Sequence, residues 1–160
     1  MKLDPSQTAA ENARILLPKM ARRYFEAGRK AIHQKTPARK LHAFRLETKR
    51  FRYTIELFRS LYGPTLERYL NQLRELQGAL GKVSDYQAIQ RVLAGDPQLK
   101  SEIEHALQGK LKGLRQTWRA FDSDGQLKRW QTYLGREPSS LRAKRTKRAA
   151  AAPKRKAAAR

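Results

Sequence analysis

Residues 37–62 read PARKLHAFRLETKRFRYTIELFRSLY, and this stretch decides the fold class. At about 100° per residue, one set of its side chains falls within roughly 100° of the helical circumference, as the buried face of a helix does. That set comprises Leu41, Phe44, Thr48, Phe51, Ile55, Phe58 and Tyr62. We therefore expect an amphipathic helix over residues 37–61 that packs against other helices.

Helix-breaking residues divide the rest of the chain. Pairs of a breaker and a capping residue occur at 36–37, 63–64, 81–84, 95–97 and 124–125. Thr8 with Glu11, and Ser84 with Gln87, have the spacing of a capping box. Pro18 is expected either to kink the first helix or to split it near Leu17. The sequence predicts an all-α antiparallel bundle with helices over 6–34, 37–61, 64–80, 84–94, 97–121 and 125–134.

The charge of the chain indicates a polyanionic partner. The 160 residues include 36 Lys+Arg and 14 Asp+Glu, which gives a net charge of +22. Ten of these cations lie in residues 136–160, a segment with few core-forming residues that we interpret as a disordered basic tail. The remaining domain, residues 1–135, is itself basic. Nucleic acid, inorganic phosphate polymers and anionic membrane surfaces are therefore all candidate partners.

Several other classes of function are not favoured. The chain has no cysteine, and its three histidines lack a metal-ligand spacing, so we expect no metal and no cofactor. No apolar stretch approaches the roughly 20 residues of a membrane span, and the N-terminus lacks the apolar core of a secretory signal. We expect a cytoplasmic protein without a membrane span. Most aromatic residues, Tyr53 among them, are expected in the core and not on a base-stacking surface.

Basic side chains form rows on three of the expected helices. His42, Arg45, Lys49 and Arg52 follow each other at intervals of three, four and three residues, beside the apolar face of the 37–61 helix. Similar spacing relates Lys19, Arg22, Glu26 and Arg29 in the first helix, and His105, Gln108, Lys112, Arg115 and Arg119 in the 97–121 helix. Like charges at these intervals repel, so such rows face either solvent or a bound anion. If the rows share one groove, they would suit a linear polyphosphate-like anion.

Two sequence blocks resemble one known family. Residues 41–45 (LHAFR), 49–53 (KRFRY) and 56–58 (ELF) are similar to the signature helix of the CHAD domain, the conserved histidine α-helical domain. Residues 73–85 resemble the following helix of that family, with its Leu-Gln-x-x-Leu-Gly segment. The resemblance extends over roughly residues 10–121, is weakest in the 97–121 helix and does not include the tail.

The resemblance implies a helical bundle that binds inorganic polyphosphate in a basic pore and has no catalytic activity. By the signature, the pore would be lined by His42, Arg45, Lys49 and Arg52, whereas Arg50 belongs to the signature but points away by helical angle. Glu56 matches a recurring acid that we expect to pair with a neighbouring arginine. Six further binding positions follow less directly. Spacing alone suggests Lys19, Lys112, Arg115 and Arg119. Similarity to the preceding helix of the family suggests Arg22 and Arg29.

This sequence departs from the family in its number of repeats. Typical members are about twice as long and contain two similar helical halves, whereas this chain has one His-x-x-Arg helix, which looks like that of the second half. A homodimer in which each chain supplies one half would complete the architecture, and an open groove on a monomer is the alternative.

Three functions remain to be compared. The first is a polyphosphate-binding module that targets or scaffolds polyphosphate granules. The second is a nucleic-acid-compacting protein, because the Lys/Arg/Ala/Pro-rich tail is similar to linker-histone tails and nonspecific binding needs only phosphate contacts. The third, an enzyme acting on phosphate chains, is not favoured, because the sequence contains no phosphate-cradling loop and no convincing metal-binding carboxylates.

Overall fold

The computed structural model describes residues 3–33, 35–92 and 97–136, and this part of the chain folds into helices without any strand. The predicted all-α fold is confirmed. The helices are α1 (Ala9–Ala31), α2 (Ala38–Leu57), α3 (Arg59–Tyr62), α4 (Thr65–Val92), α5 (Pro97–Phe121) and α6 (Gln126–Gly135). The predicted disordered tail lies outside the described residues, except for Arg136, which stacks on the Tyr133 ring.

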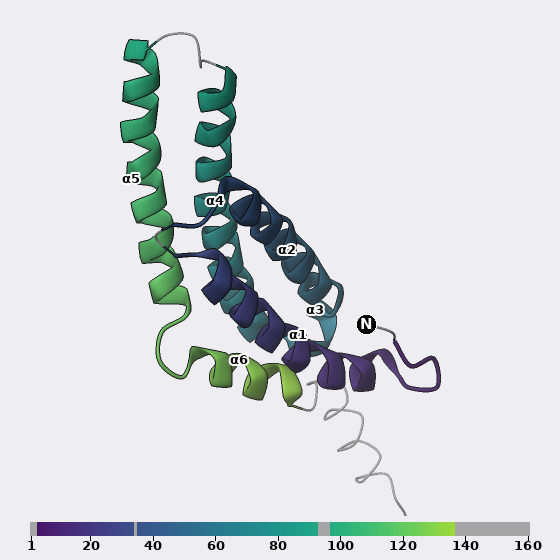
Figure 1. Ribbon diagram of the computed structural model, residues 1–160. Coiled ribbons are helices and arrows are strands. Elements are labelled where there is room, and N and C mark those ends of the chain that lie inside the picture. The colour runs from purple at the N-terminus through teal and green to yellow at the C-terminus, as the bar shows by residue number, and fades with distance from the viewer. Residues whose placement is uncertain (1–2, 34, 93–96, 137–160) are drawn as a thin grey trace, which may run out of the picture.

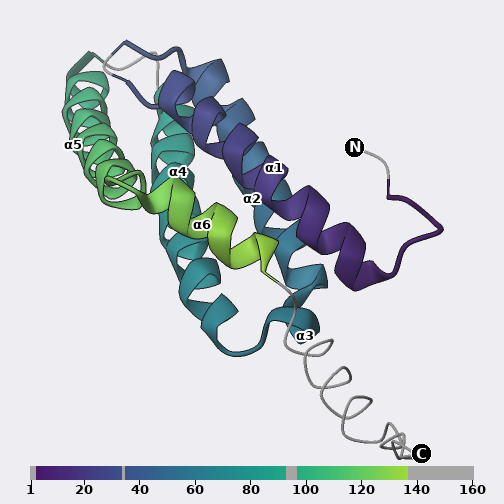
Figure 2. The same ribbon diagram turned by 90° about the horizontal axis from the view of Figure 1, so that it is seen from below.

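The helices form an antiparallel bundle around one core. α4 and α5 make a long hairpin whose far end extends beyond the other helices, as Figure 1 shows. α2 packs against α4 and also against α1, while α6 packs across α1. In Figure 2, seen from below, α1 and α6 lie in front of α2 and α4. α2 therefore lies at an edge of the bundle, with neighbouring helices on two of its sides.

α1 begins at the predicted cap and continues past Pro18. The Thr8 backbone N–H donates to Glu11 Oε2 at 2.8 Å, and the Glu11 N–H donates to Thr8 Oγ1 at 3.3 Å, which confirms the capping box. The Thr8 hydroxyl also donates to Glu11 Oε2 at 2.8 Å, and the hydrogen bonds from the Thr8 backbone N–H and hydroxyl lower the pKa of the Glu11 carboxyl. The split at Pro18 does not occur, because Leu17 and Ala21 on either side are fully buried and hold one continuous helix.

The break predicted between residues 80 and 84 is wrong. α4 runs through this region because its buried residues keep helical spacing across Gly81, and packing of that stripe outweighs the low helix propensity of glycine. The stripe comprises Leu66, Leu70, Leu73, Leu76, Leu80 and Val83. Ser84 is consequently a residue within the helix and not an N-cap. Conversely, the helix predicted over 37–61 is interrupted at Phe58, where α2 ends and the short α3 begins.

Within the core, a cluster of aromatic rings joins α1, α2, α5 and α6. The Tyr24 ring stacks on Phe44 and Phe51, with centroid separations of 5.2 and 4.6 Å. Trp118 of α5 packs against Gly28 of α1 so closely that a Cβ atom there would overlap the indole ring. The expectation that Tyr53 lies in the core is wrong: its side chain is 49% exposed, because it lies on the outer face of α2.

Candidate anion-binding face

The row His42, Arg45, Lys49 and Arg52, which we call the α2 basic stripe, runs along the side of α2 that borders α4. At its C-terminal end, Arg52 Nε donates to Gln77 Oε1 of α4 at 2.9 Å. At its N-terminal end, His42 lines a pocket together with residues of the C-terminal half of α4. The sequence predicted the row correctly, and the fold places α4 beside it as the second wall of a candidate face.

The pocket at His42 has a volume of about 540 Å³, and polar or cationic residues line it together with Ala38 and Leu107. Arg39 and His42 come from α2, Arg91 and several polar side chains come from α4, and Leu107 comes from α5. The polar side chains of α4 are Ser84, Gln87 and Gln90. The sequence prediction missed the α4 contribution because it ended that helix at residue 80 and assigned residues 84–94 to a separate helix. The spacing of Ser84, Gln87 and Arg91 would have revealed a shared helical side.

Arg45 carries an unsatisfied donor. Its Nε atom is buried and has no hydrogen-bond partner in the described structure, although the side chain as a whole is only partly buried. In the described residues, no carboxylate forms an ion pair with His42, Arg45 or Lys49. A buried cationic donor without an acceptor destabilises the folded protein. An incoming anion that accepts this hydrogen bond would remove that cost. This segment of the stripe is therefore suited to bind an anion.

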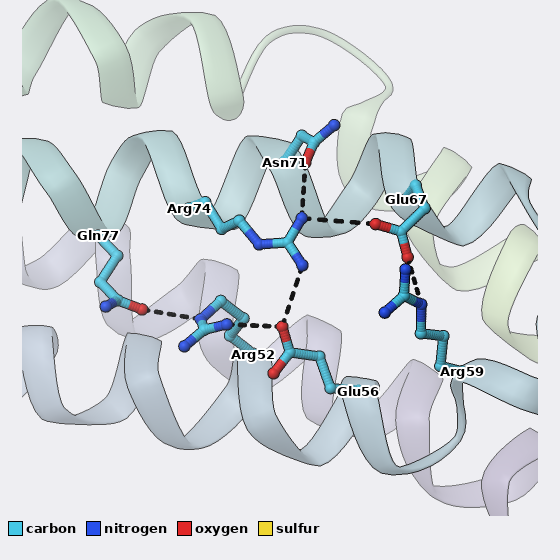
Figure 3. Close-up of polar contacts among 7 residues, drawn as sticks. All are labelled: Arg52, Glu56, Arg59, Glu67, Asn71, Arg74 and Gln77. Atoms are coloured by element: carbon cyan, nitrogen blue, oxygen red, sulfur yellow. Dashed lines mark hydrogen bonds and ion pairs between the residues drawn. The ribbon is translucent and has the colours of Figure 1, made fainter.

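The other end of the stripe is neutralised by acids (Figure 3). Arg52 pairs with Glu56 at 2.6 Å, and Arg74 of α4 reaches the same Glu56 oxygen at 3.3 Å. Arg74 also contacts Glu67 at 3.5 Å, and Glu67 pairs with Arg59 of α3 at 2.6 Å. We call these five residues the Arg–Glu network. It connects α2, α3 and α4, and it confirms that Glu56 acts as the partner of a neighbouring arginine.

Arg52 belongs to both the stripe and the network. Its Nε and Nη1 atoms are directed to Gln77 and Glu56, and its guanidinium lies 4.2 Å from the centre of the Tyr53 ring. The side chain is 13% exposed. Arg52 is thus held in place by protein partners, whereas Arg45 and Lys49 form no ion pair with an acid within residues 3–33, 35–92 and 97–136.

Two of the three cations predicted on α1, Arg22 and Arg29, have acidic partners of their own. Arg22 pairs with Glu26 at 2.9 Å on the exposed surface. Arg29 makes a bidentate contact with Asp122, at 2.8 and 2.7 Å, and this contact raises the pKa of the guanidinium. Lys19 is exposed. The structure therefore directs Arg29 toward the end of α5 and not toward the α2 basic stripe.

In the described part of the chain, the residues that line the pocket at His42 include none of the remaining predicted cations. Arg50 points away from the stripe, as its helical angle predicts, and lines a groove between α1 and α2. On α5, Lys112 and Arg119 are exposed and Arg115 is partly buried. The α5 residue at the His42 pocket is Leu107. A groove shared by all three basic rows stays a prediction.

Comparison with known proteins identifies the family. The chain matches the CHAD domain over residues 1–94, which include α1 to α4 and both motif blocks. The protein belongs to the CHAD domain family, which is associated with polyphosphate and triphosphate. No curated protein and no solved structure matches the chain.

Two further features bear on the function. Within the described ranges, no group of three or more His, Cys, Asp or Glu side chains could hold a metal ion. In the same part of the chain, every helix is too short or too polar to cross a membrane.

Proposed function

We propose that this protein binds inorganic polyphosphate, without catalysis, on the face formed by the α2 basic stripe and the C-terminal half of α4. The observation that carries the proposal is the buried, unpartnered Nε of Arg45, next to His42 and Lys49 and without a pairing carboxylate. Family membership supports phosphate chains as the ligand.

The shape of the face suits an extended ligand. His42 with Arg39 and Arg91 lines one end, and Arg45 and Lys49 continue along α2 toward the Arg–Glu network. Charge-assisted hydrogen bonds from arginine to phosphate oxygens are among the strongest polar contacts, and successive phosphates of a linear chain can occupy successive donors. At the far end, Glu56 already engages Arg52, so we expect the bound chain to lie over the His42–Lys49 segment.

Binding to polyphosphate and to nucleic acid can be separated by competition. We would titrate full-length protein with polyphosphate of defined length, at about 0.15 M salt, against duplex DNA at equal phosphate concentration. Polyphosphate binding that DNA does not displace is the expected result. Equal displacement by DNA would contradict the proposal and favour a nonspecific nucleic-acid-binding protein.

The same titration with residues 1–136 isolates the contribution of the basic tail. This truncation keeps Arg136, which donates to the Tyr62 carbonyl at 3.1 Å and so contributes to the fold. We expect DNA binding to weaken strongly and binding of short polyphosphate to persist. Loss of both activities in a protein with native helicity would place the binding site in the tail.

We further propose that binding serves to target or scaffold polyphosphate granules. The proposal of a non-catalytic role is tested by incubating the protein with polyphosphate and Mg²⁺. We expect no orthophosphate release above a protein-free control. Release that scales with protein concentration, and that disappears in an Arg45→Ala/Lys49→Ala variant, would identify an enzyme instead.

A further inference from the structure

The outer face of α2 carries a second row of side chains, distinct from the α2 basic stripe. We call it the α2 outer stripe; its members are Arg39, Ala43, Leu46, Arg50, Tyr53 and Leu57, and all six are exposed. Leu46 and Tyr53 are 50% and 49% exposed, and Leu57 is 80% exposed. α2 lies at the edge of the bundle (Figures 1 and 2), and within the described part of the chain this row borders only the groove between α1 and α2 and, at Arg39, the pocket at His42.

The spacing of this row is that of a helix–helix contact. Its members follow each other at intervals of four, three, four, three and four residues, which is the a/d pattern of a coiled-coil seam. The core-facing residues of α2 form a separate face that is already packed against the bundle. α2 therefore has two helix-packing faces, and only one of them has its partner in the described structure.

The row is complementary to a reversed copy of itself. When two copies of α2 lie antiparallel, with the midpoint near Thr48, the small Ala43 meets the large Tyr53 of the second copy. Leu46 then meets the aliphatic part of Arg50, and Arg39 meets Leu57. Alternation of small and large residues across a seam is what close packing requires. We propose that the α2 outer stripe is a homodimer interface in which the two α2 helices pack antiparallel about a two-fold axis.

Charge complementarity at the flank supports the second copy as the occupant. Glu47 and Arg50 both line the groove of about 700 Å³ between α1 and α2, beside the α2 outer stripe. In the antiparallel arrangement, Glu47 of each chain lies near Arg50 of the other, so two equivalent ion pairs form across the axis. Burial raises the pKa of Glu47, and a cation from a second chain would stabilise its ionised form.

The dimer would also bring the two α2 basic stripes together. A two-fold axis perpendicular to the helices keeps both stripes on the same side of the paired helices, next to the seam. One polyphosphate chain could then contact both copies of Arg45 and Lys49. This consequence rests on the proposed function, whereas the interface itself does not.

Sedimentation equilibrium of full-length protein, between about 1 and 100 µM and without polyphosphate, tests the interface. The variant Leu46→Gln/Leu57→Gln keeps the charge and favours helix. A matched control is Ile89→Gln/Val92→Gln, because these α4 residues are 42% and 82% exposed. We expect the wild type and the control to dimerise and the α2 variant to shift the dimer dissociation constant at least tenfold. A monomeric wild type, or a dimer unaffected by the α2 variant, would overturn the proposal.

Disulfide trapping tests the antiparallel register separately. The chain has no cysteine, so Ala43→Cys/Tyr53→Cys introduces the only thiols. Ten residues of helix separate the two positions by about 15 Å, which prevents an intrachain disulfide. Oxidation should give a covalent dimer from the double variant and much less from either single variant. Equal cross-linking of all three would contradict this register.

A binding measurement distinguishes failure of the dimer from failure of the polyphosphate site. The monomeric Leu46→Gln/Leu57→Gln variant should still bind short polyphosphate and should lose at least tenfold in affinity for long chains. If it dimerises poorly but binds long chains as the wild type does, the shared site is wrong and the interface stands. If neither protein binds polyphosphate, the proposed function fails and the interface is unaffected.

Discussion

The two ends of one polar row on α2 differ in how their charge is compensated. Arg52, at the C-terminal end, is fixed by Glu56 and Gln77, and the acids of the Arg–Glu network also hold Arg59 and Arg74. Arg45, two helical turns earlier, has a buried donor that finds no partner in the part of the chain that the structure describes. The spacing of cations along a helix is thus the same where they stabilise the fold and where they are available to a ligand. The two cases differ in that Arg52 has Glu56 four residues further along α2 and Gln77 of the neighbouring α4 as partners.

The largest effect is expected from removing the two cations of the α2 basic stripe that have no acidic partner in the described residues, Arg45 and Lys49. Arg45→Ala/Lys49→Ala should weaken polyphosphate binding by about 1,000-fold, or about 4 kcal/mol, because two charged contacts are lost. Isothermal titration calorimetry measures this change. The control Arg68→Ala/Lys128→Ala removes two exposed cations from α4 and α6 and should cost far less. If both variants lose polyphosphate affinity equally, only net charge matters. The distinction between the Arg45–Lys49 end and the Arg52 end of the stripe would then have no effect on binding.

A variant in the aromatic core separates stability from binding. Gly28→Ala places a methyl group against the Trp118 indole and should lower the free energy of unfolding by about 2–3 kcal/mol. Gly78→Ala, where a Cβ meets no atom within 4 Å, should instead raise it by about 0.5–1 kcal/mol. Urea denaturation gives both values. Both folded variants should bind polyphosphate as the wild type does; a gain in stability for Gly28→Ala would contradict the packing.

The variant Glu56→Gln tests the C-terminal end of the α2 basic stripe, where Glu56 pairs with Arg52. This change leaves Arg52 and Arg74 without their shared carboxylate and should lower the free energy of unfolding by about 1–2 kcal/mol. Polyphosphate binding should be retained or become tighter, because a negative charge next to the face is removed. Glu75→Gln, at an exposed carboxylate of α4, is the control. A large loss of binding by Glu56→Gln alone would show that the two ends act as one unit.

The smallest effect concerns Tyr62, which joins α3 to α6. Its hydroxyl donates to the Leu134 carbonyl at 2.6 Å, and burial raises its pKa to about 12. The folded protein therefore keeps this proton where the unfolded chain loses it, so stability falls as the pH rises from about 10 to 12.

Replacing Tyr62 by phenylalanine tests this assignment. Tyr62→Phe should cost about 1 kcal/mol at pH 7 through the lost hydrogen bond, and should make the alkaline decline less steep. Denaturation at pH 7, 9.5 and 11 measures both, with Tyr69→Phe as the control. If stability falls at high pH in Tyr62→Phe as steeply as in the wild type, the decline is caused by other groups. Polyphosphate binding at pH 7 should not change.

Local sequence patterns were enough to predict the all-α class, several helix boundaries and the order of the basic residues on α2. Its 3.6-residue periodicity fixed the buried face of α2, the capping box fixed the start of α1, and the motif blocks identified the family. The same spacing gave the order of the cations on α2. These features are local, because they depend only on residues within a few turns of one another.

The tertiary structure decided what each cation does. A breaker signal at Gly81 suggested two helices, but burial of one continuous leucine stripe produced α4 and placed Ser84, Gln87 and Arg91 beside His42. The partners of Arg29 and Arg74 lie 93 and 18 residues away in the chain, so periodicity could not indicate them. The exposure of Tyr53 and Leu57 likewise depends on which helices surround α2. Ion pairs within one helix, such as Arg52–Glu56, follow from sequence spacing, whereas burial and contacts between helices depend on neighbours that only the folded chain brings together.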